Sequence, residues 1–329
     1  MMIYLIFLLF GTAISQDFSC PSGYIGSNSN ALNSGANDVI VVTQVDGSFK
    51  STHISVQVGK FHNFWSTVWS REGTEMKIYV NGQKVETESK LLVGDSGKAC
   101  FNRGHHQFSL QSQEWQNAPL RSGFNRGHFQ VDALDVQIPF NVFLYDQDDH
   151  LILTDIDGTI TESDVSGHIL PNFGIDAHHD HVIELFDKAD KNGYKVVYLT
   201  ARSIAQAEST REYLFETLQD QDGFSMPQGP VFMSPRPLAV AALAAIADPA
   251  PMKTALIKSI TNTFERQANV FVGAYGNKAS DAKAYVQAGI PTELIFIVDE
   301  SSVMKRFSDQ QVTSYRQHEL LVDQMYPKL

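Results

Sequence analysis

The sequence predicts two domains of different class, a β-sandwich in the first half of the chain and an α/β domain with a parallel sheet in the second. Residues 38–149 contain short strand-like runs separated by turn residues, without a convincing long amphipathic helix. From His150 onward, apolar runs of strand length alternate with amphipathic segments of helix length. At 329 residues, the chain is long enough for both domains to bury a core.

Residues 1–15 form an apolar leader. Its stretch Met1–Phe10 is too short to cross a bilayer, which takes about 20 residues, but it has the length of a signal-peptide core. Small residues precede Gln16, where cleavage is plausible. We therefore expect a signal peptide and a location in the secretory lumen or outside the cell. The alternative is a shallow apolar anchor on the cytosolic face of a membrane.

The segment 16–37 is rich in Ser, Gly and Asn, and this composition is typical of a flexible approach to the first domain. Cys20 lies in this segment, and Cys100 is the only other cysteine of the chain. Two cysteines are not a disulfide framework. A single Cys20–Cys100 disulfide is possible, and it would accompany the secretory location.

Alternation of apolar and polar residues predicts the strands of the first domain. The clearest hairpin lies at residues 77–88, where alternating side chains flank Asn81-Gly82, the preferred pair for a two-residue type I′ turn. The other strand-like runs are residues 38–45, 54–59, 126–133 and 137–146. These short strands and their turns favour a β-sandwich.

The second domain reads as strands that are apolar throughout, with helices between them. Strands are expected at residues 150–157, 195–200, 229–234, 269–275 and 294–299, and the clearest helices at 179–193 and 203–219. Strands of this kind belong to a parallel sheet that helices cover on both faces. Ligands of such sheets bind at the carboxyl ends of the strands. Each polar cluster described next follows one of these ends.

The first cluster is Asp155-Ile156-Asp157-Gly158-Thr159, directly after the first buried strand. Asp155 and Asp157 are two residues apart, so their side chains can point into one site. Two carboxylates can share a hard cation, and one can attack phosphorus while the other handles the proton of the leaving group. Gly158 lets the backbone approach a phosphate. The alternative is a solvated turn.

Three further clusters complete the candidate site, and each has a plain structural alternative. Thr200-Ala201-Arg202 ends the second strand, where a hydroxyl and free amides could hold phosphate or Thr200 could cap a helix. Lys253 lies near a helix start and could be an ordinary surface lysine. Asn277 and Asp281 offer an amide oxygen and a carboxylate suited to Mg²⁺, or form a loop with a helix cap.

In this order, the four clusters resemble the signatures of haloacid-dehalogenase phosphatases. The resemblance is closer still to the lipin family. Residues 155–176, 192–214, 227–238 and 276–298 are similar to the lipin catalytic domain, and residues 37–60 and 76–101 to the lipin amino-terminal module. Lipins usually carry a long connector between the two modules, and here only about fifty residues separate them.

The lipin resemblance implies a fold, a reaction and roles for the site residues. The fold would be an immunoglobulin-like β-sandwich joined to an uncapped Rossmann-like phosphatase domain. The reaction would be Mg²⁺-dependent hydrolysis of phosphatidate to diacylglycerol through an aspartyl-phosphate on Asp155, with Asp157 as general acid and base. Metal ligands would be Asp155, Asp157, Asn277 and Asp281; phosphate contacts would be Gly158, Thr159, Thr200, Ala201, Arg202 and Lys253.

Charge and aromatic residues bear on the partners. The net charge of −12 argues against nucleic acid, because no basic patch could neutralise phosphates. The lipin resemblance instead implies a phosphatidate-containing membrane as the partner, contacted peripherally by the aromatic stretch Phe64–Trp69; the alternative is that this stretch belongs to the sandwich core. His178, His179 and His181 are expected to be polar residues of a loop and a helix start, not metal ligands.

Two other functions fit parts of this pattern. A non-catalytic phosphatidate-sensing module would use the same domains, but lipin-like sensors lack the nucleophile that Asp155 supplies here. A soluble phosphomonoesterase or protein phosphatase could use the same site. The spacing of about 45 residues between Asp157 and Thr200 leaves no room for an inserted cap domain, so an open site and a large substrate are expected.

Overall fold

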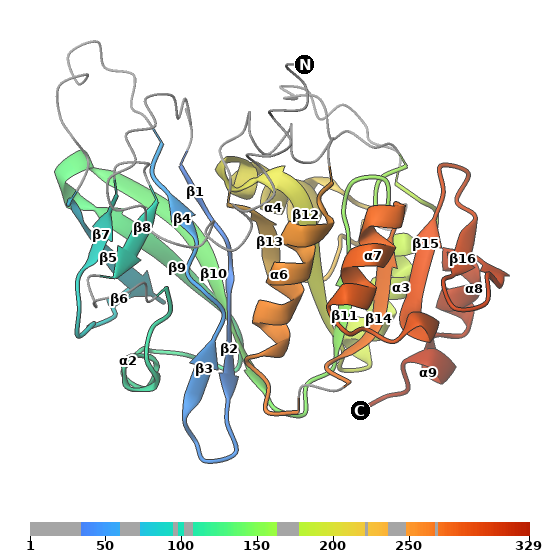
Figure 1. Cartoon of the computed structure of the whole chain (residues 1–329), viewed down its shortest axis with the longest axis horizontal. Helices are drawn as coiled ribbons and strands as arrows, with labels where there is room; N and C mark the ends of the chain where they lie inside the picture. The colour runs from blue at the N-terminus through green and yellow to red at the C-terminus, as the bar shows by residue number, and fades with distance from the viewer. Residues whose placement is uncertain are drawn as a thin grey trace, which may run out of the picture.

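The computed structural model describes residues 34–59, 73–94, 98–101, 108–162, 178–220, 223–235, 248–266 and 269–329. These residues build an eight-stranded sheet in the amino-terminal part and a seven-stranded sheet in the carboxyl-terminal part (Figure 1). A third, two-stranded sheet pairs β1 with β4. The phosphate chemistry predicted from the sequence falls on the seven-stranded sheet, so its edges and faces decide where the site lies.

The amino-terminal sheet has the strand order β3-β2-β10-β9-β5-β7-β8, with β6 paired to β5. Its elements and those beside it are β1 Gly35–Ala36, β2 Val39–Thr43, β3 Phe49–Ser51, β4 Val56–Gln57, β5 Glu75–Val80, β6 Gln83–Lys84, β7 Leu91–Val93, β8 Ala99–Phe101, α2 Ser112–Gln116, β9 Gly123–Val131, the 3-10 turn η1 Asp132–Leu134 and β10 Val136–Asp146. The predicted hairpin is confirmed: β5 and β6 pair across Asn81-Gly82, and both residues have positive φ angles, 48° and 78°.

The immunoglobulin-like sandwich is not confirmed. The eleven-residue strand β10 pairs antiparallel with β9 on one side and parallel with β2 on the other, so backbone hydrogen bonds link all eight strands. The sheet curls around its own core (Figure 1), where the rings of Phe129 and Phe140 stack at 4.3 Å and Trp115 is buried. Because the long strand β10 pairs with a neighbour on each side, the strands form one curled sheet. The alternation in the sequence had predicted two separate layers.

The carboxyl-terminal sheet has the order β13-β12-β11-β14-β15-β16-β17. Its elements are β11 Leu151–Thr154, α3 Val182–Lys191, β12 Lys195–Ser203, η2 Ile204–Gln206, α4 Ala207–Glu212, the π-helical turn η3 Tyr213–Thr217, β13 Val231–Ser234, α6 Ala250–Thr261, β14 Phe271–Gly276, α7 Ala279–Gln287, η4 Thr292–Leu294, β15 Ile295–Val298, β16 Met304–Arg306, β17 Val312–Thr313, α8 Tyr315–Leu320 and α9 Val322–Met325. The predicted parallel sheet is confirmed for its first five strands; β16 and β17 extend it antiparallel.

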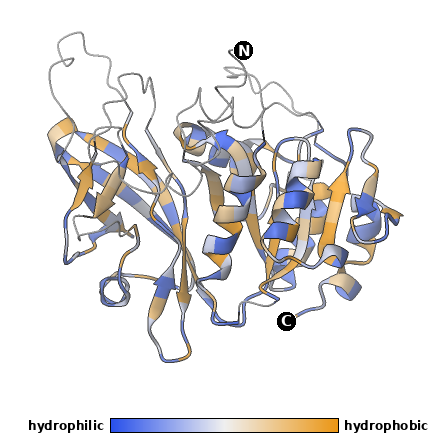
Figure 2. Cartoon of the chain, in the orientation of Figure 1, coloured by the Kyte–Doolittle hydropathy of each residue, from blue (hydrophilic) through white to orange (hydrophobic). Residues whose placement is uncertain are grey.

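Helices cover this sheet on both faces, which explains why its strands are apolar throughout (Figures 1 and 2). Each residue of β11 is fully buried. Its alternate side chains enter two different cores: Ile152 packs with residues of α3, and Leu151 and Leu153 pack with residues of α6 and α7. With both faces covered, the polar groups of the sheet are left to the strand ends.

The two large sheets share a core. Ile40 and Val42 of β2 and Phe143 and Tyr145 of β10 belong to the same buried cluster as Leu153 of β11. The amino-terminal sheet therefore helps to cover one face of the parallel sheet. The domain boundary predicted between residues 149 and 150 therefore does not separate two cores, because this cluster contains residues from both sides of it.

The segment predicted as a flexible approach ends in buried structure. Gly35 and Ala36 form β1, and a Cβ atom on Gly35 would lie 1.8 Å from the carbonyl oxygen of Ile204. Next, the side-chain amide of Asn37 both donates to the carbonyl of Met233 (3.1 Å) and accepts from its amide (2.8 Å). The Asn37 side chain thus makes the two hydrogen bonds that a neighbouring strand would make with the edge of β13. Periodicity in the sequence does not reveal this contact.

Candidate active site

The candidate site lies at the carboxyl edge of the parallel sheet, where β11, β12 and β14 end. Asp155 follows β11 and its amide donates to the carbonyl of Tyr275 on β14 at 2.9 Å. Thr200 lies near the end of β12, and Asn277 follows β14 directly. Parallel strands present their carboxyl ends at one edge, so residues far apart in sequence meet there.

A tight turn carries the residues after Asp155. The amides of Thr159, Ile160 and Thr161 all converge on the carbonyl of Ile156, at 2.9 to 3.3 Å. Gly158 has φ of +78°, and a Cβ atom there would lie 2.0 Å from the side-chain nitrogen of Asn277. Both the backbone conformation and the space therefore require glycine at this position.

Asp155 lies in a buried ionic cluster. Lys253 Nζ donates to Asp155 Oδ1 at 2.5 Å and to Asp281 Oδ1 at 2.6 Å, and all three side chains are buried. Burial raises the pKa of the Asp155 carboxyl to about 7, and the Lys253 ammonium opposes this rise. Burial alone would lower the pKa of Lys253, but the two carboxylates raise it. Lys253 therefore remains a cation beside the predicted nucleophile.

Asp157 is held by a different pair of residues. The hydroxyl of Thr200 donates to its Oδ2 at 3.0 Å. Arg202 donates through Nε to both carboxylate oxygens at 3.1 Å and through Nη2 to Oδ1 at 2.5 Å. Burial would lower the pKa of Arg202, but the Asp157 carboxylate raises it. The guanidinium also lies over the ring of Tyr213, 6.0 Å from its centroid.

The remaining predicted phosphate contacts lie around these two carboxylates. The Thr159 hydroxyl is buried, 3.4 Å from Asp155 Oδ2. The Arg202 amide, which we expected to be free for phosphate, donates to Thr200 Oγ1 at 3.1 Å. Ala201 has no polar side chain, so its predicted contribution is limited to its backbone. All the predicted phosphate contacts except Lys253 thus follow directly from two strand ends.

The predicted metal ligands divide into two kinds. Asn277 Oδ1 is buried and has no hydrogen-bond partner among the described residues, so an unpaired oxygen is available on a side chain that lies against the turn at Gly158. Asp281 Oδ2 instead accepts the amides of Asn277 and Lys278, at 3.2 and 2.9 Å. Within the described ranges, no group of three or more His, Cys, Asp and Glu forms a metal cluster. An orphaned amide oxygen at the same sheet edge as the carboxylates of Asp155 and Asp157 is a donor that suits Mg²⁺.

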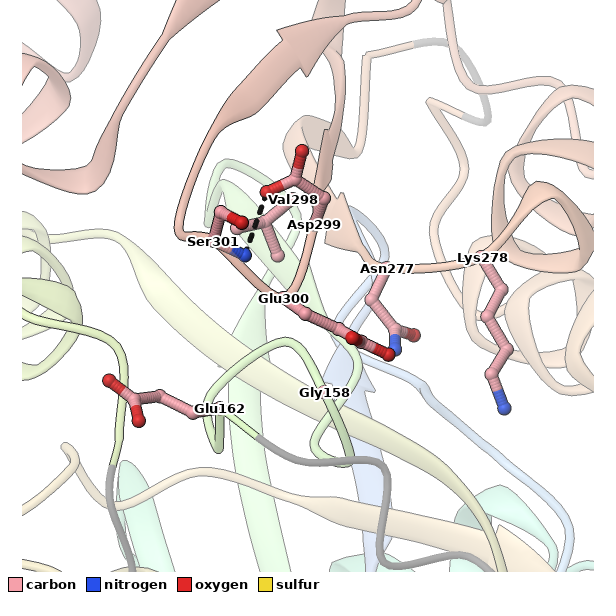
Figure 3. A pocket seen from close by; sticks show the side chains of 8 residues that line it. All are labelled: Gly158, Glu162, Asn277, Lys278, Val298, Asp299, Glu300 and Ser301. Atoms are coloured by element: carbon pink, nitrogen blue, oxygen red, sulfur yellow. Dashed lines mark hydrogen bonds between the residues drawn. The ribbon is translucent and has the colours of Figure 1, made fainter.

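A cavity of about 430 Å³ opens beside this metal-ligand set. Figure 3 shows Glu162, Asn277 and Glu300 around the turn at Gly158, with Lys278 directed away from them. Asp299 accepts the amides of Ser301 and Val303, at 2.9 and 3.0 Å, and thereby shapes the loop after β15. Glu162, Asp299 and Glu300 make this side of the site acidic, whereas Arg202 and Lys253 are buried and paired with carboxylates.

Three residues that the sequence did not indicate support the turn after Asp155. His179 is fully buried, with Nδ1 2.8 Å from the hydroxyl of Ser302 and Nε2 3.4 Å from the carbonyl of Gly158. The hydroxyl of Tyr315 donates to the carbonyl of Thr159 at 2.8 Å. His179 was expected in a polar loop, and no motif in the sequence connects it, Ser302 or Tyr315 with the turn.

Two family descriptions match the chain. LNS2 (Lipin/Ned1/Smp2) matches residues 106–327, and the lipin N-terminal conserved region matches residues 18–119. The LNS2 match includes every predicted site residue and more than half of the chain. The two matches together cover both large sheets.

Named relatives give the same result. Phosphatidate phosphatase LPIN1 of Homo sapiens is 33% identical over 226 residues, which are 67% of this chain and 25% of that protein. Phosphatidic acid phosphohydrolase 1 of Saccharomyces cerevisiae is 34% identical over 228 residues, 66% of this chain and 26% of that protein. Nuclear elongation and deformation protein 1 of Schizosaccharomyces pombe is 33% identical over 230 residues, 67% and 34% respectively. The chain thus spans about a quarter to a third of the length of these relatives.

One solved structure shows a weaker likeness. The cobalt-bound deoxy-D-mannose-octulosonate 8-phosphate phosphatase of Haemophilus influenzae covers 55% of this chain and 90% of its own, at 13% identity and a TM-score of 0.31.

The relatives correct the predicted location. The relatives are lipins, and one of them is named as a nuclear protein, so the expected secretory or secreted location is wrong, and with it the signal-peptide assignment of residues 1–15. Residues 1–33, including Cys20, lie outside the described residues. Among the helices that the structure describes, none is long and apolar enough to cross a membrane.

Sequence and architecture agree on the family of this chain. The LNS2 match spans the parallel sheet whose edge gathers Asp155, Asp157, Lys253 and Asn277, and the amino-terminal match falls on strands that share a core with that sheet. The chain belongs to the lipin family.

Proposed function

We propose that this chain is a Mg²⁺-dependent phosphatidate phosphatase that releases phosphate from phosphatidic acid through an aspartyl-phosphate. The observation that carries the proposal is the pair of buried carboxylates at one strand end, Asp155 against Lys253 and Asp157 against Arg202. Two carboxylates with separate cationic partners can take the separate roles of nucleophile and acid–base group. Relatives named phosphatidate phosphatases support the same reaction.

Asp155 is the proposed nucleophile. Its Oδ1 is bound by Lys253, and its Oδ2 has only the 3.4 Å contact to Thr159 among the described residues. Oδ2 is therefore the oxygen that can attack phosphorus, forming the bond to phosphorus as the bond to the lipid oxygen breaks. Lys253, fixed between Asp155 and Asp281, supplies positive charge for the transferred phosphoryl oxygens.

Asp157 is the proposed acid and base. It donates a proton to the departing diacylglycerol oxygen and then takes a proton from the water that hydrolyses the aspartyl-phosphate. Thr200 lies within 3.0 Å of it and can turn its hydroxyl toward a phosphoryl oxygen. Both Asp157 and Thr200 must exchange the hydrogen bonds described above for contacts with substrate during this cycle.

Mg²⁺ would be held by Asp155, the backbone carbonyl of Asp157 and Asn277, with Asp281 fixing Lys253 and the amides at residues 277 and 278. When bound, it would neutralise charge on the phosphoryl group. The orphaned oxygen of Asn277 is the observation that favours a hard cation here.

A lipid substrate is supported by the relatives and by the short connection between β11 and β12. The connection from β11 to β12 contains only α3 among its described elements, and residues 163–177 lie outside the described residues. Peripheral membrane contact through Phe64–Trp69 stays a prediction, because this stretch also lies outside the described residues.

A phosphate-release assay tests the proposal. The full chain would be given phosphatidate in micelles, glycerol phosphate or a phosphopeptide, each with Mg²⁺ and with a chelator. We expect release from phosphatidate that stops with the chelator. Equal or greater release from the phosphopeptide or glycerol phosphate would replace the lipid with a soluble substrate, and phosphatidate binding without any release would indicate a sensor.

A further inference from the structure

Arg202 has a hydrogen-bonding arrangement that the proposed catalytic cycle cannot keep. Both oxygens of the Asp157 carboxylate are engaged: the Nε–H of Arg202 is shared between Oδ1 and Oδ2, its Nη2 donates to Oδ1, and the Thr200 hydroxyl donates to Oδ2. While the guanidinium lies across both oxygens, the carboxylate cannot present a proton to a leaving oxygen. At least one donor must therefore leave Asp157 before it can act as an acid.

Of the two donors, Arg202 is the one equipped for a second partner. Its Nη1 has no hydrogen-bond partner among the described residues, and about 12% of its side chain is exposed. Its remaining side-chain contact is the ring of Tyr213, which supports the guanidinium plane without using any of its N–H donors. A planar guanidinium with unused donors matches the paired oxygens of a phosphoryl group as well as those of a carboxylate.

We propose that Arg202 exchanges partners during turnover, binding Asp157 in the resting site and a phosphoryl oxygen of the substrate in the Michaelis complex. This inference rests on the proposed function. In the resting site the pair keeps Asp157 bound and inactive. The phosphoryl group of a monoester offers Arg202 a more highly charged partner, and the exchange frees Asp157 to face the leaving oxygen.

Because Asp157 and a phosphoryl group would compete for Arg202, the exchange can be tested with inorganic phosphate as the ligand. Phosphate binding to the full chain in excess Mg²⁺ would be measured by calorimetry for the wild type, Arg202→Gln, Asp157→Asn and the double variant. Arg202→Gln should weaken phosphate binding about 10- to 100-fold, the range of one or two charge-assisted hydrogen bonds. Arg202→Lys should fall between, because it keeps the charge but not the planar pair of donors.

The Asp157→Asn arm separates exchange from simple charge repulsion. Neutralising Asp157 frees Arg202, so phosphate should bind about three- to tenfold more tightly than to the wild type, and this gain should vanish when Arg202→Gln is already present. Equal gains in both backgrounds would mean that Asp157 only repels phosphate, and the exchange would be overturned. Unchanged phosphate affinity in Arg202→Gln would likewise reduce Arg202 to a fixed support of Asp157.

Two controls keep the outcomes distinct. Arg306→Gln makes the same chemical change in a surface pair with Asp309, and it should alter phosphate affinity by less than about twofold. Thermal unfolding of each variant checks the fold. If the wild type hydrolyses no phosphatidate but the four phosphate affinities differ as described, the proposed function fails and the exchange stands. If the wild type hydrolyses phosphatidate and the substitutions do not change phosphate affinity, only the exchange fails.

Discussion

Two buried Asp–Arg pairs in this chain have the same chemistry and different surroundings. Asp38 and Arg211 join the amino-terminal sheet to the edge of the parallel sheet, with Nη2 2.7 Å from Oδ1. Asp157 and Arg202 meet at the carboxyl edge, with the corresponding distance at 2.5 Å. Both arginine side chains are about nine-tenths buried. Burial and distance alone therefore do not tell the two pairs apart.

The other donors to each carboxylate do tell them apart. Asp38 also accepts the backbone amides of Asn141 (2.7 Å) and Val231 (2.9 Å), which belong to strands and cannot turn away. Asp157 accepts its other bond from the Thr200 hydroxyl, which can rotate. Strand amides make the Asp38 pair a permanent junction, whereas side-chain donors leave the Asp157 pair free to exchange. The predictions below test this difference.

The largest effect is expected at the carboxyl edge. Asp155→Asn keeps the shape of the side chain but removes the proposed nucleophile, so phosphate release should fall at least ~10³-fold. The free energy of unfolding, measured by urea titration, should change far less than this loss implies. Substantial residual turnover in this variant would remove Asp155 from the mechanism and make the carboxyl edge another structural junction.

At the junction, the expected effect is on stability. Asp38→Ala leaves Arg211 buried without its carboxylate and the amide of Val231 without an acceptor, so unfolding should become about 3–5 kcal/mol easier. Turnover per folded molecule, measured at low temperature, should remain near the wild-type value. Asp148→Ala, which removes an exposed carboxylate, is the control and should cost less than about 0.5 kcal/mol. A catalytic defect without destabilisation would contradict the junction role.

The Mg²⁺ requirement should distinguish two residues of the carboxyl edge, Asn277 and Asp281. Asn277→Ala removes the orphaned oxygen, so the Mg²⁺ concentration for half-maximal rate should rise about 10-fold or more. Asp281→Ala should also raise it, and should in addition destabilise the fold because Lys253 loses a buried partner. Mg²⁺ binding measured directly by calorimetry provides a readout independent of turnover. An unchanged metal requirement in Asn277→Ala would exclude it as a ligand.

The smallest effect concerns a buried histidine outside both pairs. Burial lowers the pKa of His318 to about 4 from an ordinary 6.5, and its Nδ1 lies 3.0 Å from the hydroxyl of Tyr275. Its contribution to stability is complete above pH 6.5 and is lost as pH falls toward 4, because the unfolded chain takes up the proton first. From pH 7 to pH 5, the unfolding free energies of wild type and His318→Gln should converge by about 2 kcal/mol. A constant gap would contradict a neutral buried His318.

Local pattern predicted much of the second half of the chain. The apolar runs before Asp155, Thr200 and Asn277 gave the parallel strands, because a strand buried on both faces has no polar side to interrupt it. The same reasoning failed for the first half. Alternation along β10 shows one buried face, but it does not say that its two edges pair with β9 and β2 in one sheet.

Supporting residues were beyond the reach of sequence pattern for a related reason. His179, Tyr315 and Asn37 each make side-chain hydrogen bonds to backbone groups more than 15 residues away. Such contacts leave no periodicity and use residue types that are common in loops. The location predicted from the leader was wrong for another reason: an apolar run of ten residues is compatible with a signal peptide and also with a shallow membrane anchor.

By itself, the sequence determined the strand–helix alternation, the Asn81-Gly82 hairpin and the set of polar residues at strand ends, since these depend on neighbours in the chain. Only the tertiary structure decided how those residues pair. Lys253 lies 98 positions from Asp155 and Arg211 lies 173 from Asp38, and each pair forms because packed strands bring the charges together where water cannot solvate them separately. Whether a buried Asp–Arg pair is fixed or exchangeable depends on the third donor, which folding supplies.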